Sequence, residues 1–217
     1  MTTPQSDPSR DHTEERAILQ LSRLERLSDV VYALVILRIF LFVPRPGDDD
    51  WHWTTIGAFV LDNWMTFAAV LVAIAITIIY WLQSNVLLGH LVRTDGRHTS
   101  LMIGQLFFLF FFLYAIGLGI NLGPSAGART FESVTAALLG ISGGWAWAYA
   151  IRRRRLLRPD VTDEEARALA HRILAEPITA MVTIPFAFVG PGLWELSWLS
   201  YPLWVRLLKR RRRGANG

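Results

Sequence analysis

Nine polar or charged side chains lie within, or at the ends of, apolar stretches of this sequence, and their chemistry is the first question that the sequence raises. These residues are Asp29, Arg38, Asp62, Asn63, Gln83, Asn85, Gln105, Glu132 and Glu195. In hydrocarbon a charged side chain costs roughly 2.5–3.5 kcal/mol on insertion scales, so it needs a partner or water. Polar residues in such a setting are typical of ion or proton pathways and of hydrogen bonds between membrane helices.

The sequence contains no pattern of an enzyme active site. It has no Gly-x-Ser-x-Gly, P-loop or Gly-x-Gly-x-x-Gly pattern, and the absence of cysteine excludes disulfides and thiolate chemistry. The five histidines are scattered over the amino-terminal tail, the loops and the helix ends, without the spacing of metal ligands. We therefore expect a protein that is not an enzyme and that holds neither a metal nor a cofactor.

Long apolar blocks are the elements that must position the polar residues. Hydrophobic residues make up 52% of the chain, and they cluster in blocks of about 17 to 25 residues, the length needed to cross a bilayer core of roughly 30 Å. The blocks predict an all-α membrane protein with six transmembrane helices at Leu27–Val43, Ile56–Leu82, Leu101–Leu122, Val134–Ile151, His171–Val189 and Leu193–Leu208. Prolines interrupt the last two blocks, which are therefore also compatible with a re-entrant hairpin.

The basic residues predict the orientation of these helices. With six spans, 19 of the 22 lysines and arginines fall on the side that carries both termini. By the positive-inside rule this side is the cytoplasm, which predicts a cytoplasmic tail at 1–22, a transmembrane domain at 23–208 and a basic cytoplasmic tail at 209–217. The arginine runs directly after the fourth and sixth blocks favour contact with anionic lipid headgroups over binding of nucleic acid.

Two groups of polar residues map to opposite ends of the predicted spans. Ser28, Asp29, Gln83 and Asn85 lie at the inner ends of the first and second blocks, where they could form a hydrogen-bonded clamp. The outer acids are either solvated helix ends or an acidic outer vestibule, and they are Asp62, Glu132 and Glu195. In the inner connection between the fourth and fifth blocks, Thr162 and Glu165 have capping-box spacing, which predicts a short surface helix.

The inner end of the first block also carries a family resemblance. Arg23, Leu27, Ser28 and Asp29 form an R-x-x-x-L-S-D pattern, which resembles the R-x-x-x-F-S-D motif of the transmembrane protein 175 family of potassium channels. Trp81 and Asn85 near the inner end of the second block, an aromatic-rich third block and the length of the chain also resemble the bacterial members of that family. The likeness covers most of the chain in layout, but in residues only the first helix and the end of the second.

The resemblance implies a homotetramer in the bacterial inner membrane, with the first helix lining a central pore for potassium. The motif residues and Trp81 and Asn85 would then brace the inner helix ends. In the family, rings of apolar side chains on this helix form the constriction. The matching pore-facing positions in this chain are Leu34, Leu37, Arg38 and Leu41. Helical geometry by itself places these four positions on one face, since they follow i, i+3, i+4 and i+7 spacing.

Arg38 is where the sequence departs from the apolar lining that the resemblance implies. Three arrangements are open: an ion pair with an outer acid such as Asp62, an extended side chain that reaches the outer surface, or a side chain that faces the pore and repels cations. A passive potassium channel is the leading hypothesis. The alternatives are a six-span scaffold or partner-binding subunit without a pore, and a proton-coupled transporter that uses Asp29 or Asp62.

Overall fold

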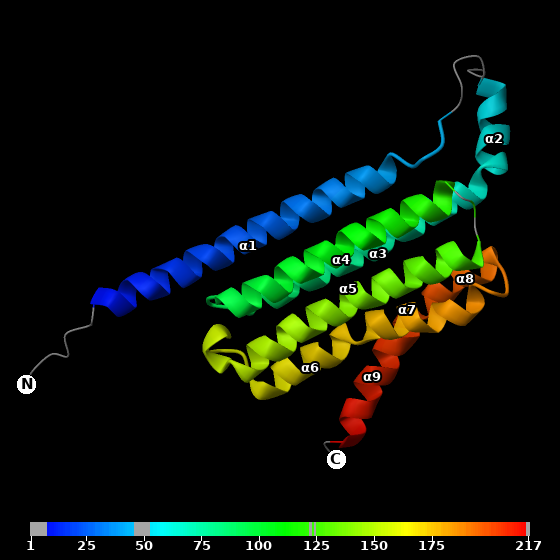
Figure 1. Ribbon diagram of the computed structural model, residues 1–217. Coiled ribbons are helices and arrows are strands. Elements are labelled where there is room, and N and C mark those ends of the chain that lie inside the picture. Colours follow the sequence, from blue (N-terminus) through cyan, green and yellow to red (C-terminus); the bar gives the residue numbers. More distant parts are fainter. Residues whose placement is uncertain (1–7, 46–52, 122, 124, 216–217) are drawn as a thin grey trace, which may run out of the picture.

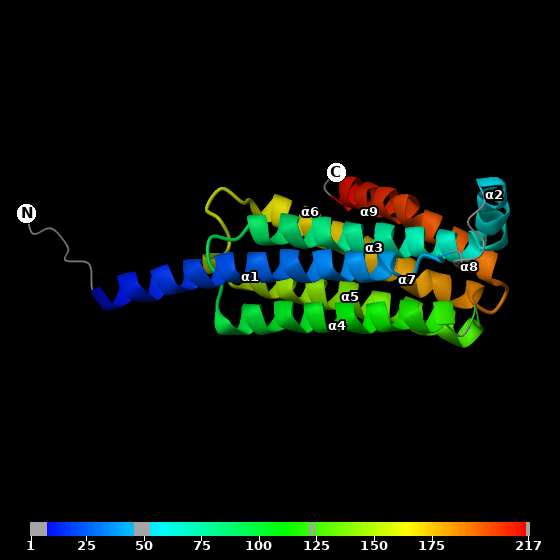
Figure 2. The same cartoon turned by 90° about the horizontal axis from the view of Figure 1, so that it is seen from above.

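The protein is a bundle of helices in which long helices run side by side along most of its length, as two perpendicular views show (Figure 1 and Figure 2). The computed structural model describes residues 8–45, 53–121, 123 and 125–215. Its helices are α1 (Pro8–Phe40), α2 (Trp53–Asp62), α3 (Trp64–Gly89), α4 (Gly96–Asn121), α5 (Ala126–Arg152), α6 (Asp163–Ile173), α7 (Ala175–Phe186), α8 (Pro191–Ser197) and α9 (Tyr201–Ala215), with short 3-10 turns at Arg154–Leu156 and Trp198–Ser200. This agrees with the predicted all-α class. The parts of the predicted segments at residues 1–7, at Leu122 and at residues 216–217 lie outside the described residues.

Helix α1 is longer than the apolar block that predicted it. It runs without a break from Pro8 to Phe40, so no helix end falls between residues 22 and 23, where the sequence predicts a boundary between tail and membrane domain. Leu21, at the end of the predicted tail, and Leu24 are buried in one core cluster with Leu87 and Leu156, which attaches the end of the tail to the bundle. The first helix is therefore one rod whose amino-terminal half is polar.

The predicted second span is divided at Asn63. Helix α2 ends at Asp62 and α3 begins at Trp64, and in Figure 1 α2 points away from the bundle that α3 joins. The side-chain amide and the backbone N–H of Asn63 both donate to the carbonyl of Phe59, at 2.9 and 3.1 Å, which closes the end of α2. The membrane-length helix is therefore α3 alone.

Three described helices are long and apolar enough to cross a membrane: α3, α4 and α5, with 26, 26 and 27 residues. The predicted fifth and sixth spans are broken instead. Helix α6 ends at Ile173 and α7 starts two residues before Pro177, while Pro191 and Pro202 stand in the first turns of α8 and α9. Proline is tolerated in a first helical turn but interrupts a helix interior, so each of these prolines marks a new helix start.

Close helix packing depends on glycines in α5. A Cβ placed on Gly140 would lie 2.8 Å from Cδ and 3.3 Å from Cβ of Pro177 in α7. Four residues later on the same helix, a Cβ on Gly144 would lie 3.7 Å from a methyl group of Ile173, which is ordinary contact. The predicted role of the Gly140–Ala150 stretch in close packing thus falls on Gly140, and on Gly143, where a Cβ would lie 2.8 Å from the side-chain amide of Gln105 in α4.

Gly140 and Gly144 make a matched test of the contact with Pro177. We expect Gly144→Ala to raise stability, by up to about 1 kcal/mol, because alanine favours the helix. Gly140→Ala should instead lower stability by about 1–2 kcal/mol, since the proline ring cannot rotate away and overpacking forces the backbones apart. Denaturation of the purified variants in detergent measures both effects. Equal stability of the two variants would contradict the role of Gly140.

One end of the bundle joins three segments that the sequence expects on one side of the membrane. The backbone N–H of Val92 donates to the carbonyl of Leu156 at 2.9 Å, and the N–H of Arg158 donates to the carbonyl of His90 at 3.0 Å. The N–H of Thr94 donates to α1 at Ala17. We call this end, formed by the start of α1 and residues 90–95 and 153–162, the basic end.

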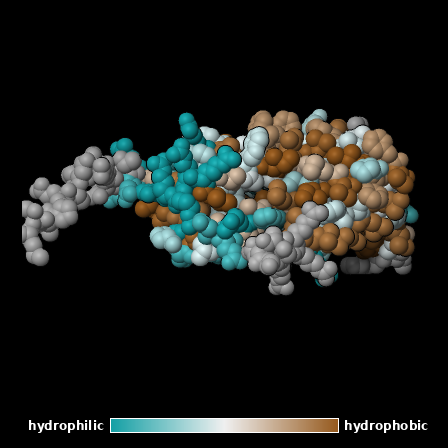
Figure 3. Space-filling model, turned by 90° about the horizontal axis from the view of Figure 1, so that it is seen from below, coloured by the Kyte–Doolittle hydropathy of each residue, from teal (hydrophilic) through white to brown (hydrophobic). Residues whose placement is uncertain are grey.

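The surface changes character along the bundle. Figure 3 shows hydrophilic residues gathered toward one end and hydrophobic residues over the remainder of the visible face. The exposed apolar side chains include Leu71 on α3, Phe107 on α4 and Trp145 on α5, each more than half exposed. An apolar band on long helices beside a polar end is the pattern of a membrane-embedded protein.

Candidate functional site

Helix α1 has a buried face and an exposed apolar face. The buried face carries Tyr32, Val35 and Ile39, each at most 1% exposed, and packs against α3 and α4. The exposed face carries a line of large apolar residues, which we call the apolar stripe: Leu27, Val30, Leu34, Leu37 and Leu41, between 45% and 58% exposed. Their spacing of three and four residues keeps them in register along a helix and is the spacing of a helix-packing seam.

The sequence predicted part of this stripe. Leu34, Leu37 and Leu41 lie where the 3.6-residue period put them. Leu27 differs from its predicted place among the bracing residues, because its side chain is 45% exposed on the stripe. Val30 was missed, although its position four residues before Leu34 carried the same periodic signal.

Arg38 lies at the edge of the stripe and is turned toward a ring. It is exposed, and its guanidinium carbon lies 4.7 Å from the centre of the Phe42 ring. That ring in turn lies close to Gly117 of α4, where an added Cβ would be 2.9 Å from it. Among the described residues Arg38 makes no ion pair, so the predicted pairing with Asp62 is not seen there. Phe42 holds the charge to the side of Leu34, toward the contact between α1 and α4.

The inner-end residues meet between α1 and α3. Trp81 donates its indole N–H to Asp29 at 2.9 Å. In the orientation that satisfies its amide, Asn85 donates to Asp29 at 3.2 Å and accepts from Trp81 at 3.1 Å. One residue away, the buried hydroxyls of Ser28 and Ser84 lie 3.4 Å apart. This contact joins Ser28, Asp29, Trp81 and Asn85, four of the six predicted motif residues, and fixes how α1 is rotated against α3.

Arg23 and Gln83 complete the predicted inner group, and neither joins that contact. Arg23 is exposed, and the described part of the chain offers it no ion pair or hydrogen bond. In the orientation that satisfies its amide, the side chain of Gln83 donates a hydrogen bond to the buried carboxylate of Glu176 in α7. Glu176 was not among the predicted site residues. Glu176 precedes Pro177 in a predicted span, and nothing in the sequence ties it to a residue so far away in the chain.

At the other end of the bundle, Arg129 forms ion pairs with two of the predicted outer acids. Arg129 contacts Glu132 at 3.3 Å and Glu195 at 2.8 Å, with side chains 7%, 3% and 9% exposed. Its guanidinium carbon also lies 4.4 Å from the centre of the Trp194 ring. The predicted vestibule of Asp62, Glu132 and Glu195 is therefore not formed in the subunit, because two of its acids face Arg129 in the interior and Asp62 is exposed at the end of α2.

A second pair of contacts supports this buried charge cluster. Trp194 donates its indole N–H to the hydroxyl of Ser133 at 2.9 Å, and the hydroxyls of Ser133 and Thr183 lie 2.6 Å apart. These bonds tie α5 to α7 and α8. The spacing of Arg129 and Glu132 (i, i+3) was a readable signal, but Glu195 is 66 residues away and only the fold brings it there.

At the basic end, Asp95 is the centre of a polar group. Its carboxylate accepts hydrogen bonds from the backbone N–H of His98 at 2.9 Å and from the hydroxyl of Tyr149 at 3.0 Å, and it pairs with Arg155 at 3.4 Å. Partial burial acts to raise the pKa of Asp95, but the three donors outweigh it and hold the pKa below its ordinary value. The carboxylate therefore stays ionised and anchors the connection between α3 and α4.

Some of the arginines that follow α5 form ion pairs within the chain. Arg154 pairs with Asp163 at 3.2 Å and Arg158 with Asp160 at 3.1 Å. The predicted surface helix follows as α6, and its predicted cap is confirmed, because the hydroxyl of Thr162 accepts from the N–H of Glu165 at 3.1 Å.

Among the described residues no group of three or more acidic, cysteine or histidine side chains is placed to hold a metal.

Comparison with known proteins identifies the arrangement of these helices. No protein-family model matches the chain, and no curated protein matches its sequence. A solved structure that is similar is a lysosomal potassium-selective channel TMEM175 homologue from Chamaesiphon minutus, with TM-score 0.65 and 18% identity over 91% of this chain and 98% of that one. The chain has the TMEM175 channel fold.

A second solved structure supports this result. A variant of the potassium channel MtTMEM175, in complex with a nanobody fusion protein, matches with TM-score 0.58 and 16% identity. The match covers 89% of this chain and 93% of that one, so the TMEM175 fold accounts for nearly the whole molecule. Both structures are under one fifth identical to this chain, and what they establish is the arrangement of its helices.

Proposed function

We propose that the chain is a member of the TMEM175 family and acts as a passive cation channel that conducts potassium. The observation that carries this proposal is the apolar stripe, five large side chains exposed in one line on α1 of the TMEM175 fold. In a homotetramer with α1 at the central axis, four such lines would meet and enclose a pore.

The membrane arrangement follows the same proposal. Helices α1, α3, α4 and α5 cross the membrane. Helix α6 lies at the membrane surface, and α7 and the α8–α9 segment supply the fifth and sixth crossings. The basic end faces the cytoplasm of a bacterial cell, in line with the positive-inside rule, and both termini lie on that side of the inner membrane. Anionic lipids are the expected surroundings of this end, and no nucleic acid partner is expected.

Conduction would depend on hydration of the stripe. Rings of Leu34 and Leu41 would form an apolar constriction that blocks ions when dry and passes them when water enters. The contact of Asp29 with Trp81 and Asn85 would set the rotation of α1 and so decide which face meets the axis. Potassium is the only species the proposal requires, with no cofactor and no catalytic residue.

A non-conducting scaffold is the second candidate, and Arg38 is the observation that favours it. The side chain is exposed on the edge of the stripe, where a positive charge repels cations. The proton-transport alternative gains no support from its two acids, because Asp29 is held by Trp81 and Asp62 is exposed on α2.

A single cysteine tests the channel and its lining together, since the natural chain has none. Leu34→Cys in vesicles should conduct potassium, and a positively charged methanethiosulfonate reagent should then lower its flux at least tenfold, because the attached cation would block the constriction. The wild-type flux should not respond to the reagent. Potassium flux from the vesicles is the measurement.

Met181→Cys is the matched control for this experiment. Met181 is 49% exposed on α7, on the opposite side of the bundle from α1 in Figure 1, and the reagent should leave its flux unchanged. Equal sensitivity of the two variants would remove α1 from the ion path. A folded wild type without flux would favour the scaffold, and flux that saturates and follows a proton gradient would favour a transporter.

The Leu34→Cys variant also reports on assembly. If α1 lies at a fourfold axis, mild oxidation should produce disulfide-linked dimers, whereas Met181→Cys should stay monomeric on a denaturing gel. Cross-linking of neither variant, with the protein folded, would count against a shared axis.

A further inference from the structure

A cleft between α6 and α9 gathers positive charge near the basic end. Its volume is about 550 Å³, and His171, Arg172 and Arg206 line it without an acidic neighbour in its wall. Arg172 and Arg206 make no ion pair within the described part of the chain, in contrast to Arg154, Arg155 and Arg158 nearby. The cleft therefore presents free cationic side chains in a concave site.

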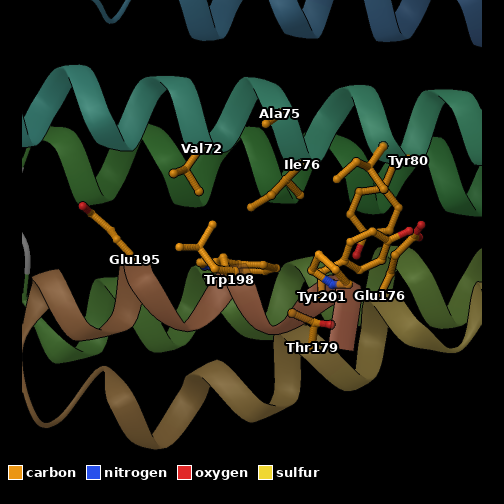
Figure 4. A pocket seen from close by; sticks show the side chains of 12 residues that line it. Val72, Ala75, Ile76, Tyr80, Glu176, Thr179, Glu195, Trp198 and Tyr201 are labelled. Carbon is orange, nitrogen blue, oxygen red and sulfur yellow. The ribbon is translucent and has the colours of Figure 1, made fainter. Parts of the chain in front are cut away.

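An apolar cavity adjoins the cleft, and the two share Tyr201 and Pro202 in their walls. Tyr201 lines the cleft and also an inner cavity of about 250 Å³ between α3 and the α8–α9 segment. Figure 4 shows this cavity, with Val72 and Ile76 of α3 on one side, Trp198 opposite them and Tyr201 at one end. The inner wall is almost entirely apolar. A basic mouth thus opens onto a long apolar slot that runs along α3.

Helix α9 has the character of a helix whose carboxyl-terminal end lies at a membrane surface. Leu203 and Leu207 are 54% and 39% exposed, while Arg206 and the basic residues after Leu208 make the helix strongly positive. Such helices bind membranes through an apolar face and through attraction to anionic lipids. The cleft lies beside this helix and is lined by its Arg206.

We infer that the cleft binds an anionic phospholipid. Its phosphate lies among His171, Arg172 and Arg206, and one acyl chain lies in the apolar cavity along α3. Charge complementarity selects the phosphate, and the apolar cavity selects a lipid over a free anion. The inference rests on the membrane location proposed above and not on conduction, so lipid binding and ion flux fail independently.

A buried acid limits how deep the headgroup sits. Glu176 lines the inner cavities and not the outer cleft, and it already receives the amide of Gln83. Arg172 lines both the outer cleft and the cavity that holds Glu176, so it separates the phosphate from that carboxylate. The phosphate therefore stays in the outer cleft, and only the uncharged chain passes the acid.

Intact-protein mass spectrometry tests the headgroup contact. The wild type in non-ionic detergent is titrated with phosphatidylglycerol and with phosphatidylcholine of identical acyl chains, and we expect at least tenfold tighter binding of the first. The Arg172→Gln/Arg206→Gln variant should lose this preference. The control Arg167→Gln/Arg158→Gln, with two exposed arginines near the same end, should keep it within twofold. Equal binding of both lipids by the wild type would overturn the inference.

A second variant tests the acyl chain and does not depend on the arginines. Ala75 lines the inner cavity from an exposed position on α3, so Ala75→Trp should fill the slot without disturbing the core. We expect at least a fivefold loss of phosphatidylglycerol binding. Unchanged binding would overturn the placement of the chain, and displacement of the lipid by an equal concentration of inorganic phosphate would show a free-anion site instead.

Discussion

Arg129→Met is expected to lower the stability of the protein by about 3–5 kcal/mol, because it leaves two buried carboxylates without their cation. Glu132 and Glu195 both face Arg129, and none of the three side chains is more than 9% exposed. Such a loss is a large part of the roughly 5–15 kcal/mol that stabilises an ordinary domain. Denaturation of the purified protein in detergent, followed by circular dichroism, gives the change.

Two variants separate the buried cluster from a general effect of losing an arginine. Arg158→Met removes an exposed ion pair with Asp160 and should cost under about 1 kcal/mol. Adding Glu132→Gln and Glu195→Gln to Arg129→Met should restore most of the stability, since neutral amides need no counter-charge. If Arg129→Met were as stable as Arg158→Met, the cluster would not hold α5 and α8 together.

Arg38→Leu is expected to raise the potassium flux of reconstituted vesicles tenfold or more. A positive charge about 10 Å from the ion in water opposes it by about 0.4 kcal/mol, and four subunits together by about 1.7 kcal/mol. This energy corresponds to a factor above ten in rate. The initial rate of potassium flux at equal protein density is the measurement.

The controls for this variant use the ring beside Arg38 and a distant arginine. Phe42→Leu should lower the flux, because the guanidinium of Arg38 would lose its aromatic partner. In the wild type its guanidinium carbon lies 4.7 Å from the centre of the Phe42 ring, to one side of Leu34. Arg167→Leu, an exposed change on α6, should have no effect. An unchanged flux for Arg38→Leu, in a protein that conducts, would place Arg38 outside the ion path.

Arg129 and Arg38 lie in opposite surroundings in one molecule. Arg129 is enclosed by two acids and an indole ring, so its charge is neutralised inside the bundle. Arg38 has an aromatic partner and remains exposed, so its charge still acts on whatever passes along α1. With an apolar lining and the charge of Arg38 at its edge, cation conduction would be slow, and removal of that charge would increase it.

Much of the site on α1 could be read from periodicity. Leu34, Leu37 and Leu41 repeat at helical spacing, so any helix puts them on one face, and the structure leaves that face exposed. The contact of Asp29 with Trp81 at the inner end was expected from the family resemblance, and the indole N–H of Trp81 donates to Asp29 at 2.9 Å. Periodicity was enough for the stripe because its spacing needs only one helix.

The helix boundaries were harder to predict, because hydropathy does not detect where a helix breaks. Asn63 divides α2 from α3 in the middle of an apolar block, and its side chain closes the end of α2 by bonding to Phe59. The prolines of the last two blocks were visible, but whether each would kink a span or begin a new helix depends on packing. Pro177 stands in the first turn of α7, where Gly140 leaves room for its ring.

The sequence by itself determined the all-α class, the long apolar helices and the helical spacing of the stripe on α1, since all of these follow from local period and composition. Only the tertiary structure decided the partners of the isolated charges. Arg129 meets Glu195 across 66 residues and Gln83 donates to Glu176 from another helix, because a buried polar group is paired or hydrogen-bonded with whichever partner the fold brings near. Such pairings leave no periodic signal in the chain.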